Sequence, residues 1–372
     1  MIEPVGNLPR LRMLLNESDL DVLVAVSPEN VTFTSGLVIA SQKFARERLA
    51  LVVWPKGGDP TFIVCNIEEP QTRQDCWIQN IRSYVEFTQS PIEVLAGTLK
   101  EMGLDKGRIG IEKSYLMANY WDELQERMPG ARLEACDSLL ASARAVKTTA
   151  EIERLGRAAR GAEKALLAVF ATIAEGESEK SMFDRIAANM LLVGGEALSH
   201  VYVNAGPNTG FPHCDASHYQ AKRGDIVNAD IGAYFGSYVS DIARTGVVGA
   251  PSEEQRSIYS RLIEVHRECI DTVRPGRRAC DVYQTMKAGH ERVGLPFPLP
   301  HGGHGIGLSL HEQPTLNPRN QTEFEPGMVV CVETRVRWPG QVGYRVEDLI
   351  LCTEGAPRVL TGFFDNGKLF EI

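Results

Sequence analysis

The chain has 372 residues, which exceeds what one hydrophobic core usually serves, so two domains are expected. Its formal net charge of -9 and its lack of Lys/Arg runs argue against nucleic acid and anionic membranes as partners. The N-terminus lacks a signal-type apolar segment, and no apolar run reaches membrane-spanning length. The eight cysteines form no C-x-x-C pair. We therefore expect a cytoplasmic protein with reduced thiols that acts on small molecules or short peptides.

The first third of the chain alternates β-like runs with helical segments, which favours an α/β domain with a mixed or parallel sheet. Strands are expected at 21–26, 49–54, 61–65, 81–87 and 108–112, and helices over 91–103 and 118–128. In KTTAEIERL, Thr148 stands three residues before Glu151, the spacing of a capping box that opens a helix. This start signal predicts a smaller N-terminal domain over 1–145 and a second domain over 146–372.

The second domain begins with helical patterns and continues with strands. Apolar residues spaced by three and four from Ile152 predict an amphipathic helix that runs to about Ala174. Further helices are expected over 178–192, 252–273 and 279–293, and strand-rich segments over 199–206, 225–249 and 327–352. The pattern is that of an α+β domain built on hairpins.

Two of the expected hairpins carry paired carboxylates. A symmetric turn at YFGS would place Asp230 directly opposite Asp241, and a turn centred on Gly340 would place Glu333 opposite Glu347. Like charges that face each other across a hairpin repel unless a cation lies between them. Two such acidic pairs in one domain, with a nearby histidine, indicate an oxygen-rich site for two bridged divalent ions.

The stretch HGGHGIGLSLHEQP, at 301–314, holds three of the eight histidines of the chain. It permits three interpretations: a phosphate-binding glycine loop, part of a metal cluster, or a glycine turn whose histidines only pack. A phosphate loop needs Gly-Lys-Ser/Thr before a helix, or a βαβ unit, and neither context is present. No G-x-S-x-G frame supports a serine hydrolase. The metal cluster is the interpretation that agrees with the paired carboxylates.

These segments together resemble the M24 metallopeptidase family, whose catalytic domain has the pita-bread fold. The resemblance rests on KTTAEIERL, on FPHCDASHYQAKRGDIVNADIGAYFGSYVSDIARTGVVG, on HGGHGIGLSLHEQP, on EPGMVVCVE and on YRVED. It implies an α+β pita-bread domain at the C-terminus and a smaller N-terminal α/β domain of the creatinase type with a mixed sheet. The metal ligands that it implies are Asp230, Asp241, His304, Glu333 and Glu347.

The resemblance also implies roles for residues around the metals. His311 matches the family histidine that stabilises the developing oxyanion, and His213 matches the one that faces the substrate. Glu333 would carry the proton to the leaving nitrogen. Arg345, two residues before Glu347, resembles an arginine that supports the ligands, and His301 borders the pocket. The other four histidines are interpreted as structural: His200, His218, His266 and His290. Cys331 shares the strand face of Glu333 and is interpreted as a small buried hydrophobe.

The function implied is metal-dependent hydrolysis of the amide bond next to proline in short peptides, as by an Xaa-Pro aminopeptidase or dipeptidase. Two divalent ions (Mn, Co, Zn or Fe) would serve as cofactors, and the resemblance implies a homodimer. Intact ligand positions argue against the non-catalytic binding modules of the same fold.

Two departures from the family pattern leave the substrate open. Glu333 is followed by Thr334, Arg335, Val336 and Arg337, where the family peptidases usually have Pro-Gly and an aromatic residue. His301 stands three residues before the metal histidine rather than four. Both positions border the pocket. The alternative is a pita-bread enzyme that acts on a small non-peptide C–N bond, as creatinase or ectoine hydrolases do, or more distantly a sulfonium lyase.

Overall fold

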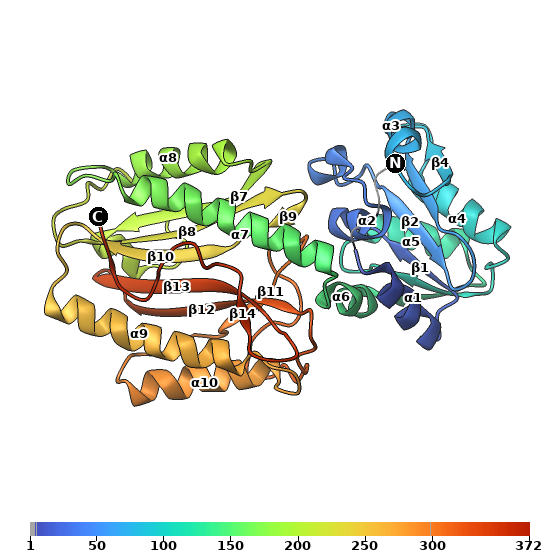
Figure 1. The fold of residues 1–372 in the computed structure, drawn as a ribbon. Helices are drawn as coiled ribbons and strands as arrows, with labels where there is room; N and C mark the ends of the chain where they lie inside the picture. Colours follow the sequence, from blue (N-terminus) through green and yellow to red (C-terminus); the bar gives the residue numbers. More distant parts are fainter. Residues whose placement is uncertain (1–3, 5, 298) are drawn as a thin grey trace. The chain divides into compact units, whose positions relative to one another are not determined.

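The computed structural model describes residues 4, 6–297 and 299–372. The chain divides into two compact units, Met1–Arg144 and Ala145–Ile372 (Figure 1). Each unit has its own sheet and its own helices.

The first unit is a six-stranded sheet flanked by helices. The strand order is β4-β3-β2-β1-β5-β6, in which β2 runs antiparallel to its neighbours and the remaining pairs are parallel. Its strands are β1 (Val22–Ala25), β2 (Leu51–Pro55), β3 (Thr61–Cys65), β4 (Asn80–Tyr84), β5 (Arg108–Ile111) and β6 (Arg132–Ala135). Its helices are α1 (Leu8–Glu17), α2 (Pro28–Ser35), the 3-10 helix η1 (Ala40–Lys43), α3 (Glu69–Asp75), α4 (Pro91–Glu101), α5 (Ala118–Arg127) and α6 (Asp137–Ala145). The predicted mixed sheet is confirmed.

Helix α4 shows why the periodic segments of this unit were predictable. The Ser90 hydroxyl accepts a hydrogen bond from the N–H of Ile92, and Pro91 occupies the first turn, where no donor is missed. Ile92, Leu95 and Leu99 recur at helical spacing and are buried in the core of the unit. The five expected strands and two expected helices all form, with ends that differ by a few residues.

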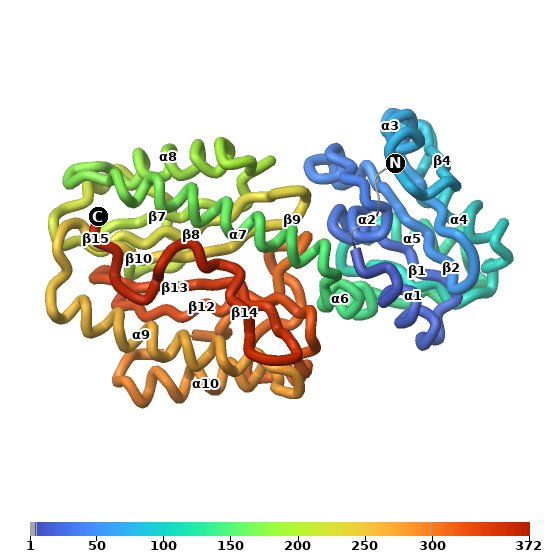
Figure 2. The backbone as a smooth tube through the Cα atoms, viewed as in Figure 1, coloured from blue at the N-terminus to red at the C-terminus, as the bar shows by residue number. Residues whose placement is uncertain are grey.

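The second unit is a larger sheet with two helix pairs. The main strand order is β11-β12-β13-β10-β8-β7; β9 also pairs with β8, β14 with β13 and β15 with β10 (Figure 2). Its strands are β7 (Ala197–Ala205), β8 (Ile226–Phe235), β9 (Tyr238–Val239), β10 (Ile242–Val247), β11 (Gly303–Gly305), β12 (Val329–Trp338), β13 (Val342–Leu351), β14 (Arg358–Val359) and β15 (Phe370–Glu371). Its helices are α7 (Thr149–Phe170), α8 (Glu179–Leu192), the 3-10 helix η2 (Gly206–Gly210), α9 (Glu253–Thr272) and α10 (Ala279–Arg292).

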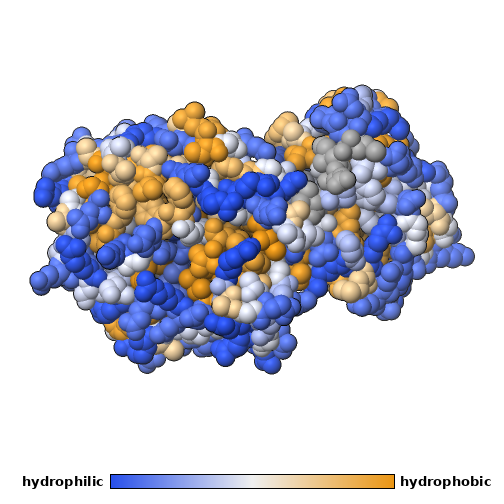
Figure 3. Space-filling model, in the orientation of Figure 1, coloured by the Kyte–Doolittle hydropathy of each residue, from blue (hydrophilic) through white to orange (hydrophobic). Residues whose placement is uncertain are grey.

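The long helices of this unit begin at capping boxes. Thr148 and Glu151 cap α7 as predicted, and Ser252 and Gln255 cap α9 in the same way. Helix α7 packs against β8 and β10, α9 packs against β12 and β13, and α8 and α10 lie beside them (Figure 1). The surface of α9 and α10 that faces solvent is largely hydrophilic (Figure 3). Within the described residues, no helix has both the length and the apolar character that crossing a membrane requires.

Strand alternation separates the two faces of this sheet. On β12, Val330 and Val332 point toward the helices and pack in one core cluster with Val265 and Cys269 of α9. Successive side chains of a strand point to opposite faces, so Glu333 points away from the helices. The helix-free face of β12 and β13 is therefore the face on which the charged residues gather.

Candidate metal centre

The β12–β13 hairpin presents two opposed glutamates. The two strands pair without a bulge from Val329 opposite Leu351 to the turn, and Glu333 stands directly opposite Glu347, as predicted. Glu333 is 3% exposed and Glu347 is fully buried. Two carboxylates in this position need a positive charge between them.

The β8–β10 hairpin has a different register from the one predicted. Asp230 stands opposite Ala243, so the expectation that it directly faces Asp241 is wrong. The turn lies one residue later than expected, because Gly236 and Ser237 both adopt positive φ angles (57° and 69°) and form a two-residue loop. Asp241 lies between β9 and β10, two residues before Ala243. Because the pairing is shifted by two residues, Asp230 and Asp241 keep a common face of the hairpin.

The glycine-rich stretch brings His304 to these carboxylates. His304 lies on β11 and pairs with Cys331 of β12. Its Nε2 is 3.4 Å from Oδ2 of Asp241 and 3.6 Å from Oε1 of Glu333. Its Nδ1 lies 2.9 Å from the carbonyl oxygen of Gly305, which can only accept, so Nδ1 carries the proton. In the neutral ring, the lone pair of Nε2 is therefore available to bind a cation.

Gly303 makes this approach of β11 to β12 possible. It has a φ of 138°, and a Cβ on it would lie 1.9 Å from the carbonyl oxygen of Cys331. We expect Gly303→Ala to displace His304 and to weaken metal binding by roughly 10- to 100-fold, an effect of the size seen when support of a ligand is lost. Metal titration of the apoprotein measures it. Gly302→Ala is the matched control, because its Cβ would be crowded by the flexible end of Met286 and not by backbone, the nearest backbone atom being 3.9 Å away. Equal metal affinities of the two variants would contradict this role.

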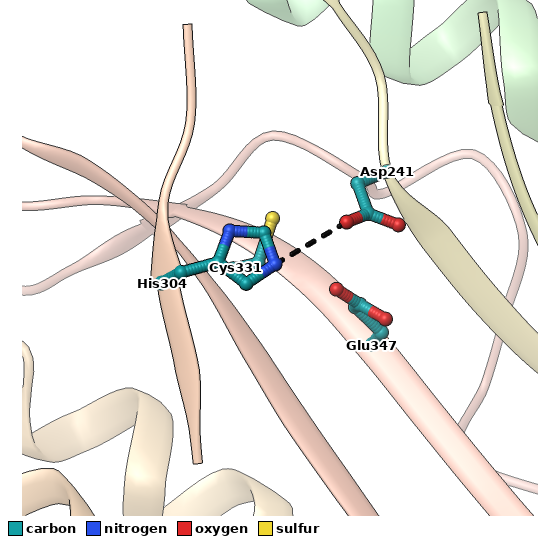
Figure 4. Close-up of side chains that lie close together, drawn as sticks. All are labelled: Asp241, His304, Cys331 and Glu347. Atoms are coloured by element: carbon teal, nitrogen blue, oxygen red, sulfur yellow. Dashed lines mark ion pairs between the residues drawn. The ribbon is translucent and has the colours of Figure 1, made fainter. Parts of the chain in front are cut away.

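The five residues implied as ligands lie in one place. Ligand atoms of Asp241, His304, Cys331 and Glu347 lie within 4.8 Å of one another (Figure 4). Those of Asp230, Asp241 and His200 form a second such group. Asp241 belongs to both groups, and Glu333 contacts His304. Within the described residues, the two groups therefore form one continuous cluster around the carboxylate of Asp241.

The donor atoms of this cluster fit divalent metal ions. Carboxylate oxygens with one imidazole nitrogen suit Mn, Co, Zn or Fe. Oε1 of Glu347 is buried and accepts no hydrogen bond from any described residue, and Oδ1 of Asp241, also buried, lies 3.3 Å from Nε2 of His200. Burial, together with the negative charges of Asp241 and Glu333, raises the pKa of Glu347 well above its usual value. A cation bound here would pair with the buried carboxylate oxygens and would offset the repulsion between the carboxylates.

Cys331 points toward the same cluster without being counted among its ligands (Figure 4). It is completely buried, and burial raises the pKa of its thiol well above the usual value. A thiol binds metal as the thiolate. Cys331 therefore lies at the wall of the site, with its sulfur close to the ligand atoms of Asp241, His304 and Glu347.

A cavity of about 270 Å³ opens over the cluster. Eight of the nine site residues named from the sequence line it: His213, Asp230, Asp241, His301, His304, His311, Glu333 and Arg345. The ninth, Glu347, is fully buried behind the cavity lining, and its Oε2 lies 2.7 Å from Nη2 of Arg345. The candidate ligands and the candidate catalytic histidines therefore share one cavity.

The histidines of the cavity have distinct surroundings. The ring of His311 lies 3.9 Å from the ring of His304, and Nδ1 of His301 lies 3.5 Å from Oε1 of Glu333. Burial, and then the positive charge of His304, lower the pKa of His311; burial also lowers the pKa of His301. Both are neutral imidazoles at neutral pH. His213 is exposed at the rim, with its ring 5.2 Å from the ring of Tyr202.

His200 was wrongly interpreted as a structural histidine. Its Nε2 lies 3.2 Å from Oδ1 of Asp230 and 3.3 Å from Oδ1 of Asp241. Burial alone lowers its pKa, but the hydrogen bonds to the two aspartates outweigh burial and raise the pKa to about 10. The signal in the sequence is Gly232, which stands opposite His200 on β8: a Cβ there would lie 2.6 Å from the His200 ring.

Arg335 and Arg337 also line the cavity, and the sequence pattern indicated no role for them beyond the departure from the family pattern. Arg335 contacts the carboxylate of Glu333, and Arg345 contacts those of Asp230, Glu333 and Glu347. Alternation along β12 was the signal that could have found both arginines, because residues 333, 335 and 337 share one face.

Comparison with known protein families agrees with this geometry. Residues 153–354 match the family model of metallopeptidase family M24, and residues 8–146 match that of the creatinase/prolidase N-terminal domain. The match to the first spans more than half of the chain and includes the ligand cluster.

Similar proteins have been named as Xaa-Pro dipeptidases. The Xaa-Pro dipeptidase of Pyrococcus furiosus is 28% identical, over 95% of this chain and 97% of that protein. The one from Pyrococcus horikoshii is 31% identical over 68% of this chain and 72% of its own length. Among solved structures, the Xaa-Pro dipeptidase from Bacillus anthracis superposes with a TM-score of 0.88 at 27% identity, and the alignment covers 98% of this chain and 99% of that chain.

Proposed function

Because the chain belongs to metallopeptidase family M24, it is a peptidase, and we propose that it uses two divalent ions to cleave the bond before proline in short peptides. The observation that carries the proposal is the convergence of the five ligand residues in one buried cluster, in which Oε1 of Glu347 has no hydrogen-bond partner among the described residues. The cavity of about 270 Å³ is at the small end of ligand sites, which favours a dipeptide or a similarly small amide.

We assign the metal ions to the five side chains that the resemblance implies. Asp230, Asp241, His304, Glu333 and Glu347 would hold them. Two bound divalent ions supply an activated water and polarise the carbonyl of the substrate. The residues of the chain then have to hold the substrate and move one proton.

Glu333 is the proposed proton carrier. Burial raises its pKa, but the positive charges of Arg335 and Arg345 outweigh burial and lower it to about 2, so the carboxylate is ionised and can accept a proton. His311, neutral at neutral pH, has one N–H to donate to the oxygen that becomes negative. His213, at the rim, is placed to orient the substrate. Each role is of the kind that general acid-base catalysis requires.

The remaining expectations complete the proposal. We propose that residues 1–145 and 146–372 act as separate domains, that the enzyme is a cytoplasmic homodimer and that its metal is Mn, Co, Zn or Fe. The resemblance to the M24 family supports the homodimer.

Chelation and reloading test the proposed function. We expect treatment with a chelator to reduce hydrolysis of Ala-Pro by on the order of 10³-fold, and Mn, Co or Zn to restore it. Mass spectrometry of the reloaded protein should find two ions per chain. Ala-Pro-Phe and a non-proline dipeptide separate an aminopeptidase from a dipeptidase and test the proline requirement. Activity that survives chelation would contradict the dinuclear site.

The alternative function concerns a small non-peptide C–N bond. It is favoured by one observation: Arg335 and Arg337 line the cavity, and they belong to the segment after Glu333 in which the family peptidases usually have Pro-Gly and an aromatic residue. A reloaded protein that cleaves a small cyclic amidine and no Xaa-Pro substrate would support it.

A further inference from the structure

Three arginines lie on the cavity face of the β12–β13 hairpin. Arg335 follows Glu333 by two residues and Arg337 follows it by four, so strand alternation places Glu333, Arg335 and Arg337 on one face of β12. Arg335 stands directly opposite Arg345. Opposed like charges destabilise a hairpin unless other groups compensate them. The question is which anions compensate these guanidinium groups.

The carboxylates of the cluster compensate only part of this charge. Arg345 lies 3.0 Å from Glu333 and 2.7 Å from Glu347. Arg335 contacts Glu333 alone, and its Nε–H donates to no partner among the described residues. Arg337 lines the cavity and is half-buried, yet the structure gives it no hydrogen bond and no ion pair with any residue that it describes.

The surroundings of Arg337 make this lack of a partner costly. Burial, followed by the positive charges of Arg335 and Arg345, lowers its pKa to about 10. The positive charge around Arg337 does not result from a basic composition, because the chain as a whole carries a net charge of -9. Positive charge is concentrated locally, at the wall of this cavity.

Bound metal ions would increase the excess of positive charge at the wall of the cavity. Four carboxylates contribute four negative charges and the three arginines three positive ones, so two divalent ions leave the site with a net charge of about +3 if the histidines are neutral. The carboxylates would then be shared with the ions and would neutralise Arg335 less. A neutral Xaa-Pro dipeptide, with one carboxylate and one ammonium group, does not balance this charge.

We propose that the substrate is an acidic dipeptide or similar small amide, with a carboxylate beyond the one at its C-terminus, and that Arg335 and Arg337 bind the additional carboxylate. The proposal deepens the proposed function and rests on it only in that the bond cleaved is an amide. Guanidinium groups pair with carboxylates through two parallel hydrogen bonds, which makes arginine the side chain suited to this task. Arg345 is left to hold the ligand carboxylates in place.

Isosteric substrate pairs test the proposal on the metal-loaded enzyme. We compare kcat/KM for Asp-Pro with Asn-Pro, and for Ala-Asp with Ala-Asn. At least one acidic member should be preferred by about tenfold or more, the size expected for hydrogen bonds between charged groups. Arg337→Gln should bring that ratio close to one, and Arg337→Lys, which keeps the charge, should retain part of it. Arg292→Gln changes the net charge equally at an exposed position of α10 and should leave the ratio unchanged.

Binding gives a second measurement that does not depend on turnover. Aspartate should bind the metal-loaded protein about tenfold more tightly than asparagine, and added NaCl should reduce the difference. Arg337→Gln should remove it. Equal kcat/KM within both substrate pairs, together with equal binding of the two amino acids, would overturn the proposal.

The same experiments separate the two proposals. Hydrolysis of Ala-Pro, with equal kcat/KM within both substrate pairs and equal binding of aspartate and asparagine, supports the proposed function and overturns the acidic substrate. Cleavage of Ala-Asp without cleavage of Ala-Pro supports the acidic substrate and contradicts the proline requirement. If no dipeptide is cleaved, the binding of aspartate and its loss in Arg337→Gln decide the acidic specificity alone.

Discussion

Asp241→Asn is expected to abolish metal binding and to reduce hydrolysis by on the order of 10³-fold or more. Asp241 belongs to both groups of potential ligand atoms, and its buried carboxylate lies 3.3 Å from Nε2 of His200 and 3.4 Å from Nε2 of His304. Asparagine has nearly the same shape, so the fold should persist. It lacks the negative charge, however, and its amide offers one weak oxygen donor instead of two carboxylate oxygens.

Metal content and thermal unfolding measure this effect. The wild-type protein should gain thermal stability when Mn or Zn is added, by about 2.7 kcal/mol at a hundredfold excess over the dissociation constant. Asp241→Asn should lose this gain and should contain no bound metal after dialysis. Asp184→Asn, at an exposed position of α8, makes the same chemical change away from the site and should behave as wild type. Retention of both ions by Asp241→Asn would overturn the ligand assignment.

The two hairpins show what sequence spacing can and cannot determine. In the β12–β13 hairpin, Pro339 and Gly340 mark the turn, so the pairing of Glu333 with Glu347 followed from symmetry. In the β8–β10 hairpin, YFGS permits two turn positions. The structure uses the later one, where Gly236 and Ser237 adopt positive φ angles that spacing alone does not reveal.

The error in register did not remove Asp241 from the site. A shift of one residue in pairing turns a strand's side chains to the opposite face, whereas a shift of two keeps them on the same face. The observed pairing differs from the predicted one by two residues, so both aspartates still face His200. Alternation is therefore a safer basis for predicting which residues share a site than is direct opposition.

The residues that the sequence did not identify depend on contacts between distant strands. His200 reaches Asp230 because β7 pairs with β8 and because Gly232 leaves room for its ring. Neither fact follows from the pattern around His200 itself. In the first unit, residues 28–35 form α2 although PENVTFTS lacks helical periodicity; the helix is held by the Ser27 cap and by buried Val31 and Phe33. Tertiary contacts decided both features.

Arg244→Met is expected to cost the second unit about 3 to 5 kcal/mol of stability. Arg244 is fully buried and lies 2.9 Å from Glu163 of α7 and 2.8 Å from Asp348 of β13. It also donates to the carbonyl oxygen of Glu347 at 2.6 Å. Methionine has a similar volume, so little space is lost, but two buried carboxylates lose their counter-charge. The arginine thus ties the helix layer to the strand that carries a proposed metal ligand.

The cost should depend on pH in a defined direction. Burial raises the pKa of Asp348, but Arg244 and then His266 outweigh burial and hold it below its usual value. A carboxyl whose pKa is lowered on folding contributes stability above its unfolded pKa of about 3.9 and loses that contribution as the pH falls. Arg244→Met removes the contribution, so the difference between wild type and variant should be largest at neutral pH and should shrink as the pH falls below about 4.

Thermal unfolding at pH 7 and at low pH measures both expectations. For a unit of this size, the loss corresponds to a fall in Tm of about 10 °C at neutral pH. Arg267→Met, at an exposed position of α9, is the matched control and should change Tm little. A fall that is equally large at low pH would show that lost packing dominates, whereas a fall confined to neutral pH establishes that Arg244 acts through its charge on Glu163 and Asp348.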